Sequence, residues 1–440
     1  MTQPYDERRK RALEGFAGGV AVIPSARIVA RNNDTEYEFR QNSDFYYLTG
    51  FDEPDCVLVL APENGEHRSV LFLRERNRAH EIWNGRRLGV EGATAALGVD
   101  AAFPIAELEQ RLPQYFSGSK TLWYALGNDD AMDRSLLNAL ESARAGARRK
   151  GVAPQSISEP ANVIHPLRQI KSFDEIAIMR HAAEITGRGH VAGMRITRPG
   201  IFEYEVEAAV EYEYRRAGAQ RDAYETIVGS GDNATILHYV SNRDMLVDGA
   251  LVLVDSGCEY NYYASDVTRT WPVNGRFSPE QRAIYEIVLA AQLAAIREIA
   301  PNRPQNAFHQ AAVRVITEGL IDLGLLHGSV DENIEQERYR DYYMHGTGHW
   351  LGLDVHDVGR YRQEDGEPVL FAPGMAITVE PGIYIHRDLD CDERFKGIGV
   401  RIEDDILVSE HGNENLTVAI PKEIDELEEV VGAGITAAIR

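Results

Sequence analysis

Hydrophobic and polar residues follow different rhythms along the chain, and these rhythms predict where strands and helices form. In the first part, short apolar runs begin near residue 20 (VAVIP), at residue 56 (CVLVLAP) and at residue 69 (SVLFLRE). Runs of this length and composition predict strands. The turn PENGEH joins the second run to the third, and its Asn64-Gly65 pair is typical of a β-hairpin. The first part of the chain is therefore predicted to be α/β.

Further along the chain, apolar residues recur at helical spacing behind clear start signals. A helix is predicted to open at Ser172, whose side chain forms a capping box with Glu175. A second helix is predicted to open at Ser278-Pro279 and to stop at Pro301, and a third ends near Gly324. The segment HPLRQIKS around Pro166 separates the two parts, so we predict two domains, residues 1–168 and 169–440.

The second part also contains apolar, β-branched runs that predict strands, and these runs belong to a faint internal repeat. The segment VEAAVEYEY at 206–214 resembles HQAAVRVIT at 309–317. The strand-like runs repeat in the same order, and each copy carries two acidic residues at matching places. The runs are LVLVDSG with Asp255, SDVTRT with Asp266, MAITVEPG with Glu380 and IEDDIL with Glu403. The repeat predicts that two half-domains each contribute a pair of carboxylates to one shared centre.

Composition and charge narrow the class of protein. The 440 residues are 44% hydrophobic, and a chain of this length is too long to fold around a single hydrophobic core, which agrees with two domains. The net charge of −23 disfavours nucleic acids and anionic membranes as partners. The N-terminus MTQPYDERRK lacks the apolar core of a signal peptide, and no apolar run reaches the roughly 18 residues of a membrane helix. We therefore expect a cytoplasmic globular protein.

The densest cluster of candidate ligands is MHGTGHWLGLDVHDVG at 344–359. His345 and His349 stand four apart, but Gly346 and Gly348 lie between them and no Glu follows His345, so a zinc-protease helix is disfavoured. The spacing G-x-G-x-x-x-G also differs from the dinucleotide fingerprint. From Leu351 the pattern alternates apolar and polar, which predicts a turn that leads into a strand.

Four carboxylates and one histidine suit two divalent ions about 3.5 to 4 Å apart, as in two-metal hydrolases. Ligation dominated by oxygen, with one imidazole, favours Mn²⁺, with Co²⁺, Zn²⁺ or Fe²⁺ as alternatives. The three cysteines are few and scattered, so neither a disulfide framework nor a thiolate metal cluster is indicated. The cysteines are Cys56, Cys258 and Cys391.

Each candidate residue also has a purely structural interpretation. Asp255 suits a turn and Asp266 a solvated strand end. Arg401 and Glu403 stand two apart on a predicted strand, where Arg401 forms an ion pair with Glu403 or orients it as a ligand. His238 sits among apolar residues, as a core histidine does. The acidic residues Glu207, Glu211 and Glu213 fit a solvated helix face.

Taken together, the motifs VDSG…SDVTRT, HGTGHWLGLDVHD, VEPGIY and GVRIEDDI resemble those of the pita-bread metallopeptidases. This family includes aminopeptidase P, prolidase, methionine aminopeptidase and the metal-free creatinase, and the resemblance covers about residues 170–435. It implies an α+β pita-bread domain with a pseudo-twofold repeat, preceded by a smaller α/β domain of the creatinase type. It also implies that the metal ligands are Asp255, Asp266, His349, Glu380 and Glu403, with Asp266 and Glu403 bridging two ions.

The same resemblance implies further roles in peptide hydrolysis. Glu380 would exchange a proton with the attacking water, and His238 would lie near the substrate amide. His345 and His356 would stabilise the tetrahedral intermediate. Tyr384 and Arg401 match positions on the proline side of the substrate.

Among the members of this family, the segments RQNSDFYYLTGFDEPDCVLVL and IWNGRRLG resemble the N-terminal domain of aminopeptidase P. The expected activity is therefore release of the first residue from peptides with an N-terminal Xaa-Pro sequence. Prolidase, which acts on Xaa-Pro dipeptides, is the alternative, and a non-enzymatic peptide-binding or scaffold protein is a distant one. For Trp83 of IWNGRRLG, a partly buried core position and a pocket role stay open. The family also leads us to expect a homo-oligomer, a dimer or tetramer.

Overall fold

The computed structural model describes residues 4–61 and 68–434, which divide into two compact units, Met1–Arg168 and Gln169–Arg440. The predicted turn at Asn64-Gly65 lies outside the described residues, but the strands on either side of it pair antiparallel, as a hairpin requires. Among the residues that are described, no helix combines the length and apolar composition needed to cross a bilayer.

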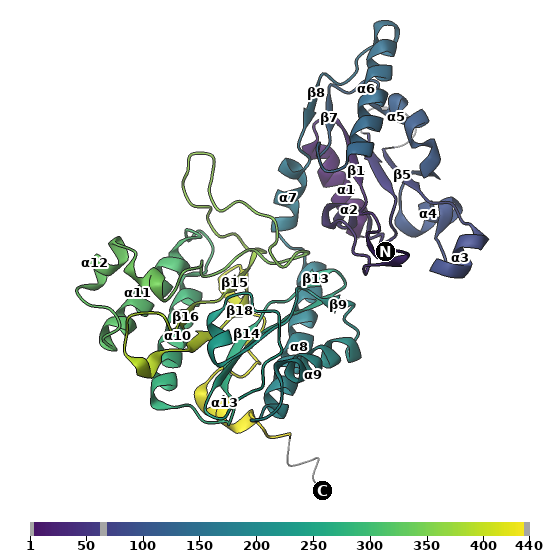
Figure 1. Ribbon diagram of the computed structural model, residues 1–440. Coiled ribbons are helices and arrows are strands. Elements are labelled where there is room, and N and C mark those ends of the chain that lie inside the picture. Colours follow the sequence, from purple (N-terminus) through teal and green to yellow (C-terminus); the bar gives the residue numbers. More distant parts are fainter. Residues whose placement is uncertain (1–3, 62–67, 435–440) are drawn as a thin grey trace. The chain divides into compact units, whose positions relative to one another are not determined.

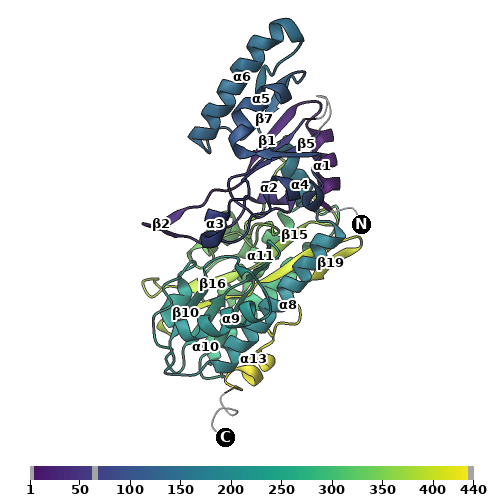
Figure 2. The same cartoon turned by 90° about the vertical axis from the view of Figure 1, so that its right-hand side faces the viewer.

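The first unit is built on a six-stranded mixed sheet in the order β6-β5-β4-β1-β7-β8. Helices α5 and α6 cover one side of strands β1 and β7, and α1 lies on the other (Figure 2). Alternate strand residues such as Val20, Val57 and Phe72 pack against Leu112 and Leu140 of these helices, which buries one face of the sheet. The strands are β1 (Val20–Pro24), β4 (Val57–Leu60), β5 (Ser69–Leu73), β6 (Ala101–Pro104), β7 (Thr121–Trp123) and β8 (Ser156–Ser158). The helices are α1 (Pro4–Gly15), α2 (Ser43–Thr49), α3 (Arg78–Asn84), α4 (Gly89–Leu97), α5 (Leu108–Phe116), α6 (Asp130–Lys150) and α7 (Ala161–Gln169), and a small hairpin joins β2 (Ala30–Asn32) to β3 (Thr35–Glu36).

Helix α3 carries Trp83, which is 85% exposed, and no residue of this helix is buried. The interpretation of Trp83 as a partly buried core aromatic is therefore wrong. The spacing of apolar residues could not predict the exposure of Trp83, because a helix of seven residues makes only about two turns and does not define a buried face.

The second unit contains the internal repeat that the sequence predicts. In each half, two helices that pack together precede a pair of antiparallel strands. Figure 1 shows strands β14 and β18 between the helix pair α8 and α9 on one side and α10 and α11 on the other. The first half consists of α8 (Phe173–Ile196), α9 (Glu203–Arg216), β9 (Arg221–Asp222), β10 (Ile227–Ser230), β11 (Leu251–Asp255), β12 (Cys258–Tyr260), β13 (Tyr263–Ala264) and β14 (Thr268–Pro272). The second half consists of α10 (Pro279–Glu298), α11 (Ala307–Asp322), α12 (Val330–Glu335), β15 (Ala376–Val379), β16 (Gly382–Ile385), β17 (Ile398–Arg401), β18 (Asp404–Ser409), β19 (Gly412–Asn415) and α13 (Ile424–Val430).

The predicted start signals of the helices are present in the structure. Ser172 caps α8 and exchanges hydrogen bonds with Glu175, and Ser278 does the same with Gln281 at the start of α10. These caps satisfy amide groups that the first turn of a helix leaves without a partner. Neighbouring residues alone therefore determine where both helices begin.

The acidic face of α9 is less exposed than the sequence suggests. Glu207, Glu211 and Glu213 are all partly buried, so the prediction of a solvated face is wrong for them. Asn242 donates to Glu207, and Arg216 donates to Glu213. Burial, together with the charges of Asp222 and Glu207, raises the pKa of Glu211 to about 7.

Glu211→Gln is expected to stabilise the protein at pH 8 and to leave its stability unchanged at pH 4.5. The folded state keeps a proton on Glu211 up to about pH 7, whereas the unfolded chain loses it near the usual glutamate pKa of 4.5. The free energy of unfolding therefore falls as the pH rises through this window. A neutral Gln removes the cost of holding an ionised Glu211 beside Asp222 and Glu207. Because the side chain is partly exposed, solvent screening limits this cost to roughly 1 kcal/mol or less. Urea denaturation at both pH values measures the effect, and Glu213→Gln, which removes the partner of Arg216, should bring no gain at pH 8.

Candidate metal centre

The four predicted carboxylates lie at matching places in the two halves of the second unit. Asp255 is the last residue of β11, and Asp266 precedes β14 by two residues. Glu380 directly follows β15, and Glu403 directly precedes β18. Each strand pair is antiparallel, so the end of the first strand and the start of the second lie at the same edge. Each half thus presents two carboxylates from one edge.

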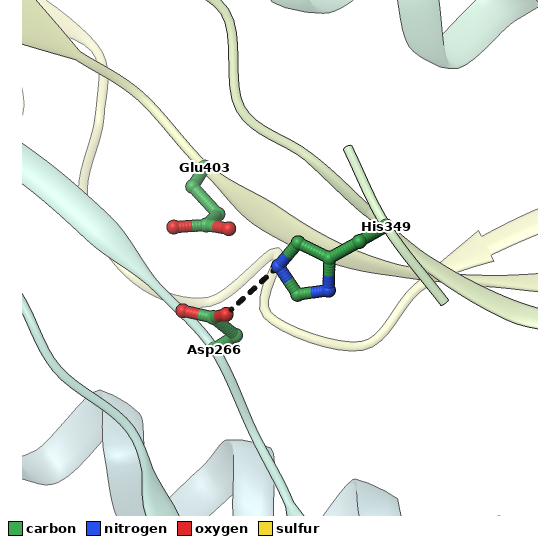
Figure 3. Close-up of side chains that lie close together, drawn as sticks. All are labelled: Asp266, His349 and Glu403. Atoms are coloured by element: carbon green, nitrogen blue, oxygen red, sulfur yellow. Dashed lines mark ion pairs between the residues drawn. The ribbon is translucent and has the colours of Figure 1, made fainter. Parts of the chain in front are cut away.

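Side chains from both halves converge on one point. Asp266, His349 and Glu403 each offer a ligand atom, and these atoms lie within 4.8 Å of one another. Figure 3 shows the three side chains pointing toward one another. Nε2 of His349 is 3.3 Å from Oδ2 of Asp266 and 3.6 Å from Oε1 of Glu380. Carboxylates and one imidazole at this spacing form a suitable donor set for divalent cations.

The orientation of His349 also suits a ligand. Its Nδ1 lies 3.1 Å from the carbonyl oxygen of Trp350, which can only accept, so Nδ1 carries the hydrogen. Nε2 then faces the carboxylates; burial lowers the pKa of His349, but Asp266 and Glu380 raise it to about 9. A cation bound there would displace the Nε2 proton, as in metal sites where a carbonyl fixes the orientation of the ring. The chain reaches this position because Gly348 has no Cβ, and a Cβ there would lie only 1.9 Å from the carbonyl oxygen of Thr378.

The carboxylates of the cluster lie so close together that they are stable as anions only beside a positive charge. Burial and the neighbouring carboxylates Asp266, Glu380 and Asp255 raise the pKa of Glu403 well above its usual value. Burial raises the pKa of Glu380 to about 7, although His349 and Arg401 act in the opposite direction. Buried carboxylates of this kind are stable as anions only when cations compensate them.

Arg401 contacts Asp255 rather than Glu403. Its Nη2 donates to Oδ2 of Asp255 at 2.5 Å, so the ion pair between Arg401 and Glu403 considered from the sequence is wrong. The link to Glu403 runs through Thr268, which accepts from Nε of Arg401 and donates to Oε2 of Glu403 at 2.7 Å. Strand β17 ends at Arg401, so the two residues do not share one strand face.

The sequence gives no signal for Tyr224, which nevertheless belongs to the cluster. Its hydroxyl lies 2.6 Å from Oδ1 of Asp255 and 2.5 Å from Oδ1 of Asp266. Burial and these carboxylates raise the pKa of Tyr224 well above its usual value, so the phenol stays a donor. Thr268 was likewise missed, because a threonine in a strand and a tyrosine between two short strands look like ordinary packing residues.

His345 lies in a chain of hydrogen bonds with Tyr384 and Arg401. Nη1 of Arg401 donates to the hydroxyl of Tyr384 at 3.0 Å, and this hydroxyl lies 2.8 Å from Nε2 of His345. Nδ1 of His345 is 2.7 Å from the carbonyl oxygen of Gly346. Burial, helped by the charge of Arg401, lowers the pKa of His345 to about 3, so the ring is neutral and both nitrogens are engaged. Because the carbonyl of Gly346 can only accept, Nδ1 carries the single ring hydrogen, and His345 must release Gly346 before it can donate to a substrate.

The remaining two histidines face a cavity of about 520 Å³ that the carboxylates also line. His356 packs edge-on against His349, with ring centroids 4.3 Å apart, and burial lowers its pKa. His238 is exposed, so the interpretation as a core histidine is wrong. The cavity also has apolar walls, which suit a side chain of a bound peptide. They are formed by Ile227, Leu237, Val240 and Val355.

The predicted strand from Leu351 is wrong, because residues 352–356 form successive bends and none of residues 351–358 belongs to a strand. The amide of Asp357 donates to the carbonyl of Trp350 at 2.8 Å, which folds the segment back on itself. The carboxylate of Asp357 forms a buried ion pair with Lys171, 3.0 Å from its Nζ. These long-range contacts override the local alternation of apolar and polar residues, and they place His356 beside His349.

Comparisons with known proteins agree with this geometry. The model of metallopeptidase family M24 matches residues 177–410, and that of the aminopeptidase P N-terminal domain matches residues 5–123. The Xaa-Pro aminopeptidase of Escherichia coli (strain K12) is 46% identical over 433 residues, 98% of each chain. Aminopeptidase PepP of Pseudomonas aeruginosa is 47% identical and has a TM-score of 0.95 over 99% of both chains. Zinc-substituted Escherichia coli aminopeptidase P in complex with product is 44% identical and has a TM-score of 0.94, over 100% of this chain and 99% of that one.

These matches cover both units of the chain. They confirm the resemblance that the sequence motifs suggest and the pita-bread fold that it implies. The family also implies divalent metal ions, which the convergent donor set can hold. The chain belongs to metallopeptidase family M24 and, within it, to the Xaa-Pro aminopeptidases.

Proposed function

We propose that the protein removes the N-terminal residue from peptides that carry proline in second position. The observation that carries the proposal is the convergence of Asp266, His349 and Glu403 beside a cavity, in a chain that matches Xaa-Pro aminopeptidases over nearly its full length. The acidic centre also favours a free substrate amine, which limits cleavage to the first peptide bond.

We propose that two divalent ions bind at this centre, with Mn²⁺ favoured over Co²⁺, Zn²⁺ and Fe²⁺ because oxygen dominates the ligands. When bound, such ions polarise the scissile carbonyl and lower the pKa of a water molecule so that it becomes nucleophilic near neutral pH. The proposed ligands are Asp255, Asp266, His349, Glu380 and Glu403.

In this proposal the side chains move the protons and stabilise charge. Glu380 accepts a proton from the attacking water and passes it to the leaving nitrogen, a role that suits a carboxylate of the cavity wall with Oε1 3.6 Å from Nε2 of His349. His356 is neutral at pH 7 and donates to the developing oxyanion. His345 acts as a second donor through Nδ1–H once it releases the carbonyl of Gly346. His238, which lines the cavity, contacts the scissile amide.

We assign the proline side of the substrate to Tyr384 and Arg401. Both are buried, and they are hydrogen-bonded to each other. Their mutual bond, together with the bond from Arg401 to Asp255, fixes their positions relative to the metal ligands. A preformed polar wall of this kind orients a substrate at little entropic cost.

Removal and return of metal tests the proposal. After treatment with a chelator and dialysis, the protein is expected to lose hydrolysis of Ala-Pro-Ala and to regain it with Mn²⁺, whereas Ala-Ala-Ala stays intact. Release of the first residue is measured by chromatography, with untreated protein as control. Cleavage of Ala-Pro alone would identify a prolidase, and absence of cleavage of any peptide by metal-loaded protein would favour a non-enzymatic role.

The domain division, the cellular location, the oligomeric state and the role of Trp83 remain predictions. The division into domains 1–168 and 169–440, the cytoplasmic location and the homo-oligomeric state, a dimer or tetramer, are proposed from the sequence and the family. Trp83, exposed on α3, is available for a pocket role. The free state of all three cysteines agrees with a reducing compartment.

A further inference from the structure

Glu203 is a fully buried carboxylate at the first position of helix α9, outside the metal centre. The centre does not use it, and the sequence marks it only as one more glutamate of an acidic helix. All five hydrogen bonds that its carboxylate accepts come from neutral groups. These donors are the amide of Ser230 at 2.8 Å, the hydroxyl of Ser230 at 2.9 Å, Nδ2 of Asn233 at 3.0 Å, the hydroxyl of Tyr239 at 3.0 Å and the amide of Asp244 at 2.9 Å.

The five donors belong to one segment, residues 230–244. Ser230 and Asn233 hold its beginning, Tyr239 its middle and Asp244 its end. The backbone adds a further bond at the end, from the amide of Glu203 to the carbonyl oxygen of Asp244 at 2.9 Å. A single carboxylate therefore fixes the segment at three places.

This segment carries one wall of the substrate cavity. Leu237, His238 and Val240 all line the cavity, and Tyr239, which donates to Glu203, directly follows His238 in the chain. The His238 ring itself is exposed, so its position depends on how its backbone is held. Leu237 and Tyr239 pack on the apolar cluster that contains Tyr384, which fixes the other side of the segment.

The charge of Glu203 is suited to this task. A carboxylate has lone pairs for several donors, and bonds to an ionised acceptor are shorter and stronger than those between neutral groups. The N-terminus of α9 also favours a negative charge. A glutamine of the same size would turn an NH₂ group toward donors, so it would break at least one of the anchor points.

We propose that Glu203 is a positioning residue of peptide hydrolysis, which holds segment 230–244 so that His238 faces the scissile amide. The inference rests on the proposed function, because His238 takes part in catalysis only there. Glu203 acts through His238 and touches neither the substrate nor the metal ligands.

The test is a double-mutant cycle with Mn²⁺-loaded enzyme and Ala-Pro-Ala. Glu203→Gln is expected to lower kcat/KM by about 10- to 100-fold, mainly through kcat, because small misplacements of a catalytic group cost rate. In a His238→Ala background, the same change is expected to alter kcat/KM by less than about two-fold. Metal content, measured by mass spectrometry, should stay unchanged. Glu205→Gln is the matched control and should keep wild-type activity, because Glu205 lies in the same first turn of α9 but is exposed and accepts only from the amide of Phe202.

The outcomes separate the two proposals. An equal loss from Glu203→Gln in both backgrounds, or wild-type activity of Glu203→Gln, would overturn the positioning role while the proposed function stands. If wild-type enzyme cleaves Ala-Pro-Ala but His238→Ala is fully active, the role of His238 fails and the inference with it. Should Glu203→Gln not fold, Tyr239→Phe removes the single bond next to His238, and its loss of kcat must also vanish in the His238→Ala background.

Discussion

Glu380→Ala is expected to abolish hydrolysis of Xaa-Pro peptides, with a fall in kcat of at least about 10³-fold. Proton transfer by a positioned carboxyl contributes about 10² to 10⁴ in rate, and Glu380 is proposed both to transfer the proton and to bind metal. Glu380 directly follows β15, and its Oε1 lies 3.6 Å from Nε2 of His349, so the substitution removes a carboxylate from the centre itself.

The two roles of Glu380 can be separated by Glu380→Gln. The amide keeps an oxygen for a metal ion but cannot accept the proton, so we expect turnover to be lost while the metal content stays near that of the wild type. Steady-state kinetics and mass spectrometry measure the two quantities on the same sample. Glu410→Gln, at an exposed position after β18, is the control. Activity of Glu380→Gln within ten-fold of wild type would refute the proton-transfer role.

Arg269→Met is expected to destabilise the second unit by about 3 to 5 kcal/mol, because it removes one partner of a buried ion pair, leaving Asp404 only Lys422 as a cation, and also takes the donor from buried carbonyl oxygens. Arg269 and Asp404 are both 0% exposed, and Nη2 lies 2.7 Å from Oδ1 of Asp404. The same guanidinium donates to four carbonyl oxygens that would lose a donor. These carbonyls belong to Thr268, Glu403, Ile420 and Pro421.

Calorimetry and urea denaturation measure this loss, which corresponds to a fall in Tm of about 10 °C for a unit of this size. The matched control is Arg180→Met, because Arg180 also donates through Nε and Nη2 to a carboxylate, that of Glu414, but on the surface. An exposed pair contributes about 0 to 1 kcal/mol, so the control should change Tm little. Similar losses from both variants would show that burial does not determine the strength of the Arg269 contacts.

Much of the fold could be predicted from the sequence because its signals are local. The capping boxes at Ser172 and Ser278 mark helix starts with neighbouring residues alone, and both are present. Strands β11, β14, β15 and β18 form where β-branched runs occur, since such side chains suit a buried pleated sheet. The repeat then predicted that two halves of the unit carry matching carboxylates, which the structure brings to one centre.

Two predictions from local sequence patterns were wrong because contacts with distant residues override these patterns. Residues 351–358 alternate like a strand, yet the buried pair of Lys171 and Asp357 and the bond from Asp357 to Trp350 bend them. His238 lies in an apolar stretch, which suggests a core position. Its segment is instead held by hydrogen bonds from Tyr239 and Asp244 to Glu203 of helix α9. In both cases a partner far away along the chain, Lys171 for Asp357 and Glu203 for Tyr239 and Asp244, helps to decide the conformation.

The sequence by itself determined the family, the succession of helices and strands, and the identity of the acidic residues and histidines at the centre. Only the tertiary structure decided how these side chains are paired: Tyr224 between Asp255 and Asp266, Arg401 on Asp255, and Thr268 between Arg401 and Glu403. The physical reason is that propensity and capping act between neighbours in the chain, whereas hydrogen bonds between buried polar groups depend on which strand ends meet in space.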